Sequence, residues 1–164
     1  MGIAQLSSPG LFRFFGVYYN TSGRQRQLFL STPKCKIVMS EEDKRFVIQE
    51  HSSGSDVHWD FMLELGTGQS LQTYRLDKTP QQVLHNPADA VRIFDHAPKF
   101  LTYQGLVNKG RGSVRIVESG TYQIVHNEHD RIELNLAGQI LKGNFKLCHV
   151  KDDKWQFIAD STNG

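Results

Sequence analysis

Three side chains with metal-binding chemistry lie close together in residues 46–64. His51 follows an apolar run, a short serine- and glycine-rich segment comes next, and His58 and Asp60 follow it. From residue 57 polar and apolar residues alternate, which predicts a strand with His58 and Asp60 on the same face. Two imidazoles and a carboxylate can hold a divalent ion and leave positions open for water and substrate, as in catalytic metal sites. Mixed nitrogen and oxygen ligands favour Mn²⁺, Zn²⁺ or Fe²⁺ over Ca²⁺ or Mg²⁺.

The same three residues allow a plainer interpretation. His58 and Asp60 could be surface residues on the solvated face of a strand, with His51 in a loop. A histidine and an aspartate separated by one residue form a short pattern that also arises by chance. The spacing alone leaves both interpretations open.

A second group of residues could bind or act on an anion. His96, next to Asp95, could serve as a general acid or as a phosphate-binding imidazolium oriented by that carboxylate. Arg75 and Lys78 near the end of a predicted strand could clamp an anion, and Arg111 lies in a glycine-rich segment suited to phosphate contacts. A structural histidine and ordinary exposed cations are the alternatives.

Composition sets broad limits on the function. The chain has 164 residues with 38% hydrophobic and 22% charged, and its formal net charge of +2 permits nucleic-acid binding without requiring it. Its two cysteines, Cys35 and Cys148, are far apart and form no C-x-x-C motif, so we expect reduced thiols and a cytoplasmic location. No apolar run approaches the roughly 20 residues of a membrane span.

Short strands separated by turns dominate the chain from Phe46 onward. Ser119-Gly120 predicts a two-residue hairpin turn, Gly143 a bulge or barrel corner, and residues 88–91 a short helical turn. This pattern predicts an all-β fold, a small closed or nearly closed antiparallel β-barrel with short helical turns. The predicted strands are residues 57–65, 71–76, 112–118, 121–126, 131–136, 140–150 and 155–160.

The chain divides into two predicted parts. Residues 1–38 are an N-terminal extension of uncertain structure, and residues 39–164 form the barrel domain. Met39 and the charged residues after it resemble a natural chain start, which indicates an appended leader or a start codon assigned too far upstream. The alternative is an ordinary N-terminal arm that packs on the domain.

Taken together, several segments resemble the 3′-phosphoesterase domain of the bacterial and archaeal DNA ligase D family. The residues of HWDFMLE and GRGSV are most similar to those of its small stand-alone branch. The resemblance covers about residues 45–160. The segments that carry it are QEH (49–51), HWDFMLE (58–64), TYRLDKTP (73–80), DH (95–96), YQGLVNKGRGSVRIVESGTY (103–122) and LKGNFKL (141–147), with Trp155.

The resemblance implies a small β-barrel enzyme with its active site in a groove. Such enzymes remove a 3′-terminal ribonucleoside and then the 3′-phosphate, which leaves a 3′-hydroxyl for a repair polymerase or ligase, and manganese usually activates them. By resemblance His51, His58 and Asp60 are the metal ligands, His96 acts on the phosphate, and Lys78 contacts it.

The chain departs from the family pattern at several positions. Met62 and Ala88 stand where arginines are expected, and Phe100 stands where a tyrosine is expected. The six residues between His51 and His58 are one more than usual. Two alternatives therefore stay open: a catalytically weakened module that binds nucleic-acid 3′ ends, and a metallo-phosphoesterase for a small phosphorylated metabolite. Cations that could replace the lost arginines are Arg75, Arg92 and Arg111.

Overall fold

The computed structural model describes residues 44–66 and 68–160, and all structural statements concern these residues. The strands are β1 (Lys44–Ser53), β2 (Asp56–Glu64), β3 (Leu71–Leu76), β4 (Ala88–Arg92), β5 (Gly105–Val107), β6 (Gly112–Asn127), β7 (Arg131–Gly138), β8 (Lys142–Lys151) and β9 (Lys154–Ala159). The helical segments are α1 (Pro80–Val83), η1 (Pro98–Leu101) and η2 (Asn108–Gly110).

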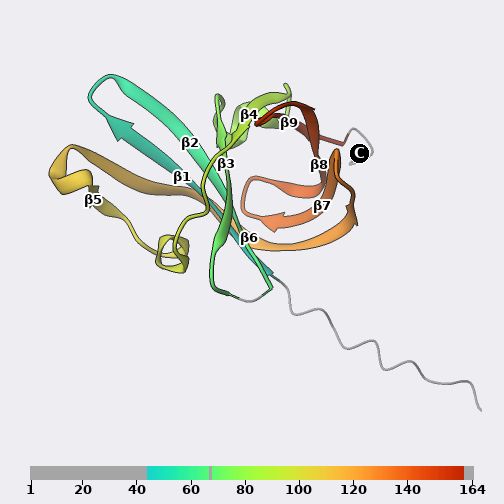
Figure 1. Cartoon of the computed structure of the whole chain (residues 1–164), viewed down its shortest axis with the longest axis horizontal. Helices are drawn as coiled ribbons and strands as arrows, with labels where there is room; N and C mark the ends of the chain where they lie inside the picture. The colour runs from blue at the N-terminus through green and yellow to red at the C-terminus, as the bar shows by residue number, and fades with distance from the viewer. Residues whose placement is uncertain (1–43, 67, 161–164) are drawn as a thin grey trace, which may run out of the picture. The chain divides into compact units, whose positions relative to one another are not determined.

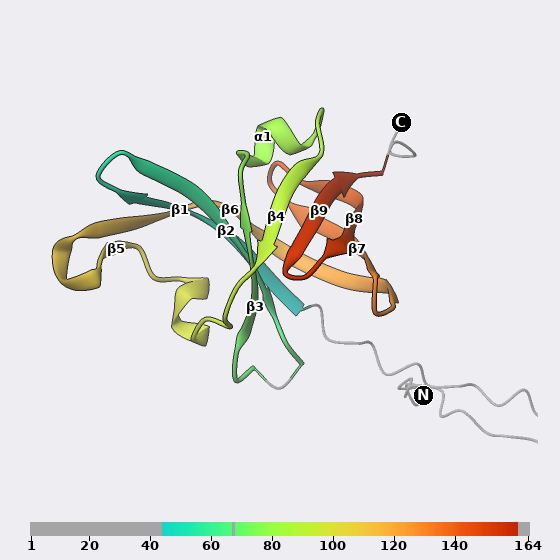
Figure 2. The same ribbon diagram turned by 45° about the horizontal axis from the view of Figure 1, so that its top comes forward.

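The strands form one antiparallel sheet that closes on itself. Neighbouring strands follow the order β1-β2-β3-β4-β9-β8-β7-β6, and pairing of β1 with β6 completes an eight-stranded barrel (Figure 1). β5 adds to the far side of β6. The predicted closed antiparallel β-barrel with short helical turns is confirmed. Figure 2 shows the β1–β2 hairpin and β5 extending to one side, away from β7, β8 and β9.

The interior of the barrel is apolar and rich in aromatic rings. Side chains alternate across a strand, so β1 and β2 direct Phe46, Ile48 and Phe61 inward, where each is almost fully buried. The Phe61 and Phe157 rings stack with centroids 4.8 Å apart, and Phe145 and Phe157 are 5.4 Å apart. This core holds the strands that carry the candidate site.

A second, smaller apolar cluster lies on the outer face of the barrel. The segment containing η1 covers this face, and the buried Gln49 side chain of β1 holds it by donating to the carbonyl oxygens of Phe100 (2.8 Å) and Tyr103 (2.7 Å). The cluster contains Val47, Met62, Leu71 and Leu101, with Phe100 and Ile116 packed against it. The second half of β2 therefore packs against the barrel core on one face and against the outer apolar cluster on the other.

The burial of His58 and Asp60 decides between the two interpretations of the histidine–aspartate pattern. His58 is only 8% exposed and Asp60 only 5% exposed. An ionisable pair at such depth is not a solvated strand face, because burial without a partner is costly. The surface interpretation of these two residues is wrong.

The predicted hairpin turn at Ser119-Gly120 is also wrong, because both residues lie inside the continuous strand β6. Gly120 pairs with β1 on one side and with β7 on the other. A Cβ atom at this position would lie 2.2 Å from the carbonyl oxygen of Ala137. The glycine thus allows close approach of two strands rather than a reversal of the chain.

The helical turn predicted for residues 88–91 is a strand instead. These residues form β4, which pairs with β3 on one side and β9 on the other. The backbone hydrogen bonds of β4 with β3 and β9 outweigh the weak helical preference of Ala88 and Ala90. The short helix is α1, eight residues earlier, where Pro80 stands at its start and Thr79 and Gln82 form a capping box.

Other local expectations agree with the structure, differ from it or fall outside it. Residues 71–76 form β3, as predicted. Gly143 adopts a φ of 97° within β8, but the pairing of β8 with β7 stays in register there, so the predicted bulge is absent from this ladder. No helix within the described ranges is long and apolar enough to cross a membrane. Residues 1–38 lie outside the described residues, so the division at residue 38 stays a prediction.

Candidate metal centre

The β1–β2 hairpin brings the two candidate histidines together. Gly54 and Ser55 form its turn, in which Gly54 takes a left-handed φ of 61°. Four of the six residues between the histidines belong to the strands, so His51 lies directly opposite His58 in the ladder. Asp60 is two residues further along β2 and therefore faces the same side.

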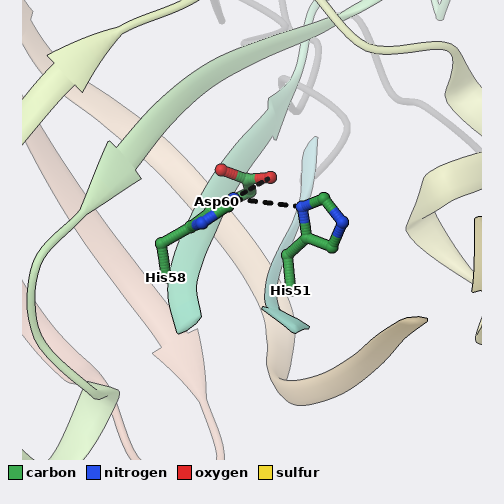
Figure 3. Close-up of side chains that lie close together, drawn as sticks. All are labelled: His51, His58 and Asp60. Carbon is green, nitrogen blue, oxygen red and sulfur yellow. Dashed lines mark hydrogen bonds and ion pairs between the residues drawn. The ribbon is translucent and has the colours of Figure 1, made fainter. Parts of the chain in front are cut away.

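The ligand atoms of these residues converge, as Figure 3 shows. Nδ1 of His51 lies 3.0 Å from Nε2 of His58, and that Nε2 lies 3.8 Å from a carboxylate oxygen of Asp60. One ligand atom from each residue lies within 4.8 Å of the others. The structure therefore brings together the three residues that the sequence singled out as metal ligands.

The donor set fits a divalent metal ion. Two imidazole nitrogens bound at about 2.1 Å and roughly at right angles would be about 3 Å apart, which agrees with the separation of the His51 and His58 nitrogens. Oδ1 of Asp60 is buried and finds no hydrogen-bond partner among the described residues. Its charged neighbour is Nε of Arg75 at 3.5 Å, which makes no hydrogen bond to it, so the oxygen keeps a lone pair that a metal ion would satisfy. Nitrogen and carboxylate donors suit a transition metal.

Asp56 orients the His58 ring. Its carboxylate oxygen lies 3.3 Å from Nδ1 of His58, and this nearby negative charge favours a proton on Nδ1, which leaves the Nε2 lone pair directed toward His51 and Asp60. Burial lowers the pKa of His58 below its usual value, although the nearby Asp60 opposes this effect. A neutral imidazole is the form that binds metal. Sequence reasoning missed Asp56, although it lies on the same strand face as His58.

Gly112, at the start of β6, packs against the His51 ring. A Cβ atom there would lie 3.0 Å from both Nε2 of His51 and the carbonyl oxygen of Ser52. Gly112→Ala is therefore expected to displace His51 and to weaken Mn²⁺ binding about tenfold, the usual effect of disturbing a residue that supports a ligand. Isothermal titration of the chelator-treated protein with Mn²⁺ measures this change.

Gly66→Ala is a matched control, because a Cβ atom there would lie at an ordinary 3.7 Å from Cε of Lys44. This variant should bind Mn²⁺ like the wild type. Unchanged affinity in Gly112→Ala would show that the His51 ring does not depend on this contact.

His96 lies on the same outer face and is held by β3. It forms a β-bridge with Leu71, and its Nδ1 lies 3.0 Å from the hydroxyl oxygen of the buried Thr73. That hydroxyl donates its only hydrogen to the Leu71 carbonyl (2.9 Å), so it accepts from Nδ1–H of His96. The arrangement leaves Nε2 of His96 available for a substrate.

Asp95 does not make the contact with His96 that the sequence suggested. Its carboxylate pairs with Arg92 and accepts a hydrogen bond from the Ser70 hydroxyl at 3.2 Å. Thr73 takes the orienting role instead. Sequence reasoning missed Thr73, because its contact with His96 crosses 23 positions of the chain.

Comparison with known families identifies the class of protein. A sequence model of the DNA ligase D 3′-phosphoesterase domain matches residues 49–149. The chain belongs to the DNA ligase D 3′-phosphoesterase family. The matched range contains His96 and the three residues that could hold a metal ion. No curated protein matches the chain in sequence. The family is one of phosphoesterases that process nucleic-acid 3′ ends, and the predicted resemblance is confirmed.

The candidate phosphate-binding cations of this 3′-phosphoesterase domain occupy different surroundings. Arg75 lies opposite Asp60 in the β2–β3 ladder, with its Nε 3.5 Å from the carboxylate and its side chain 44% exposed. Lys78 follows β3 and pairs with Asp77 at 3.1 Å. Arg111 is exposed and directly precedes Gly112, which contacts His51. Arg75 is thus the cation placed directly against the metal-binding group.

The three residues that depart from the family pattern make apolar or aromatic contacts in the structure. Met62 is buried in the outer apolar cluster, and Ala88 is fully buried in the barrel core opposite Phe157. An arginine at either position would need a different local packing. Phe100 meets the His96 ring edge-on, with centroids 5.5 Å apart. Of the suggested replacement cations, Arg92 pairs with Asp95 and donates to the Thr73 carbonyl at 3.2 Å.

Proposed function

We propose that this chain is a metal-dependent phosphoesterase that removes a 3′-ribonucleoside, a 3′-phosphate or both from nucleic acid and leaves a 3′-hydroxyl in DNA repair. Manganese is the proposed metal, with zinc or another divalent transition metal as the alternative. The convergence of His51, His58 and Asp60 in a chain of this phosphoesterase family is the observation that supports the proposal. A repair polymerase or ligase would use the product.

Residues of the β1–β2 hairpin and of β3 are assigned to metal binding and to charge compensation. A bound divalent ion would polarise a phosphate oxygen and lower the pKa of a bound water. His51, His58 and Asp60 would hold it, with Asp56 keeping His58 in the required tautomer. Arg75, next to Asp60, would offset negative charge on the incoming phosphate.

His96 is assigned the contact with the reacting phosphate. Because Thr73 accepts its Nδ1–H, Nε2 is the atom left for the substrate, and in the imidazolium form it donates to a phosphate oxygen or to the leaving oxygen. Lys78 and Arg111 are assigned to more distant phosphate oxygens, where fixed positive charge stabilises the transition state.

A labelled primer–template that ends in a 3′-phosphate or a single ribonucleotide tests this function. The wild type should convert the end to a 3′-hydroxyl with Mn²⁺ and not with chelator. His51→Ala and His58→Ala should remove this activity, whereas His85→Ala, at an exposed position after α1, should retain it. Retained turnover and normal metal content in either ligand variant would refute the assignment.

The same assay separates the alternatives. A non-catalytic end-binding module is favoured by Met62, which places an apolar side chain where the family carries an arginine. It would bind a 3′-phosphate end with salt-dependent affinity and show no turnover with any divalent metal. A metabolite phosphoesterase would act equally well on mononucleotides and on primer–template ends.

A further inference from the structure

An aromatic ring stands exposed beside His96. Phe94 is 77% exposed, the highest value among the exposed large apolar side chains in the described part of the chain. Its ring stacks on the His96 ring with centroids 5.0 Å apart and an angle of 13° between the planes. A single exposed apolar residue is common on protein surfaces. The parallel stack on the histidine assigned to the phosphate distinguishes Phe94 from the other exposed residues.

The backbone presents this ring on a fixed segment. The N–H of Ile93 donates to the Thr73 carbonyl at 3.1 Å, and His96 exchanges two backbone hydrogen bonds with Leu71 at 2.8 and 3.0 Å. Phe94 therefore lies between two positions that are tied to β3. Little conformational freedom would be lost when a ligand contacts it, which favours binding.

His96 has supports that do not involve Phe94. Thr73 holds its Nδ1, and Phe100 packs edge-on against the ring at 5.5 Å. Phe94 is thus not needed to position the imidazole. The nearby negative charge of Asp95 is paired with Arg92, so it does not repel an approaching phosphate strand.

We propose that Phe94 is a stacking platform for the base of the 3′-terminal nucleotide. The proposal rests on the proposed function and adds a specificity determinant to it. With the phosphate at Nε2 of His96, the base of the same nucleotide would stack on Phe94. Every base has a π face, so the platform would accept all bases and would favour nucleotide ends over phosphate esters that lack a base.

Two matched oligonucleotides test this role, one with a normal 3′-terminal nucleoside 3′-phosphate and one whose terminal nucleotide is abasic. Phe94→Ala is expected to raise KM about tenfold for the first, in line with the contribution of base–aromatic stacking. Phe94→Ala should not change kcat for the oligonucleotide with the normal terminal nucleotide. It should change neither kcat nor KM for the abasic one. Phe94→Trp should restore the wild-type KM. Leu106→Ala, at an exposed position of β5, is the control.

Equal losses on both oligonucleotides would show that Phe94 acts through His96 and would overturn the proposal. A second measurement does not depend on turnover. An oligonucleotide with 2-aminopurine at its 3′-phosphorylated end is titrated in chelator, and stacking should quench its fluorescence with the wild type and Phe94→Trp but not with Phe94→Ala. Absence of quenching with the wild type would refute the platform. Absence of turnover with quenching intact would refute only the proposed enzyme function.

Discussion

Asp60→Asn is expected to lower Mn²⁺-stimulated release of 3′-phosphate by at least about a hundredfold, because a ligand of a catalytic metal contributes more than the residues that support it. The substitution keeps the size of the side chain, so the buried position stays filled. It removes the negative charge and a carboxylate oxygen that has no hydrogen-bond partner among the described residues. Initial rates on a labelled 3′-phosphate end measure the loss.

Metal-dependent stability gives a second readout for the same variant. Metal at about a hundred times its Kd stabilises a folded protein by about 2.7 kcal/mol. The rise in Tm that the wild type shows on adding Mn²⁺ should therefore shrink or vanish in Asp60→Asn.

Glu64→Gln is the control for Asp60→Asn, because Glu64 is a carboxylate on the same face of β2 that pairs with Arg45 at 2.7 Å. It should retain both the wild-type activity and the response to metal. Wild-type activity in Asp60→Asn, with an unchanged Tm response, would remove Asp60 from the ligand set.

Glu118→Ala is expected to lower the free energy of unfolding by about 4 kcal/mol. The Glu118 carboxylate is only 2% exposed and accepts from four backbone N–H groups at 2.5–2.9 Å, those of Ser119, Gln139, Ile140 and Leu141. It thus ties β6 to the turn between β7 and β8. Its removal leaves buried donors without an acceptor, which is the costly case. Urea unfolding followed by fluorescence measures the change.

Glu133→Ala serves as the comparison, since Glu133 makes a surface pair with Arg131 at 3.4 Å. Exposed ion pairs contribute about 1 kcal/mol or less, so this variant should be close to the wild type. Equal stability of the two variants would show that the hydrogen bonds of Glu118 contribute no more than a surface charge.

The strand pattern and the grouping of the three candidate metal ligands could be predicted from sequence. Alternation with a period of two places His58 and Asp60 on one face whatever the partner strands are. The serine–glycine segment between His51 and His58 has the composition of a loop, and in the structure a hairpin there brings the two histidines together. The closed barrel was predicted because many short strands with turn signals at regular spacing suit few other folds.

Contacts between residues far apart in the chain decided the rest. Gln49 fixes the covering segment through Phe100 and Tyr103, and this covering buries one face of β2. The partner of His96 is Thr73 rather than its sequence neighbour Asp95. Sequence periodicity reports the direction in which a side chain leaves its own strand, and the tertiary structure sets what that side chain meets. The candidate metal ligands were therefore predictable as a group, whereas their burial and the residues that contact them depended on segments distant in the chain.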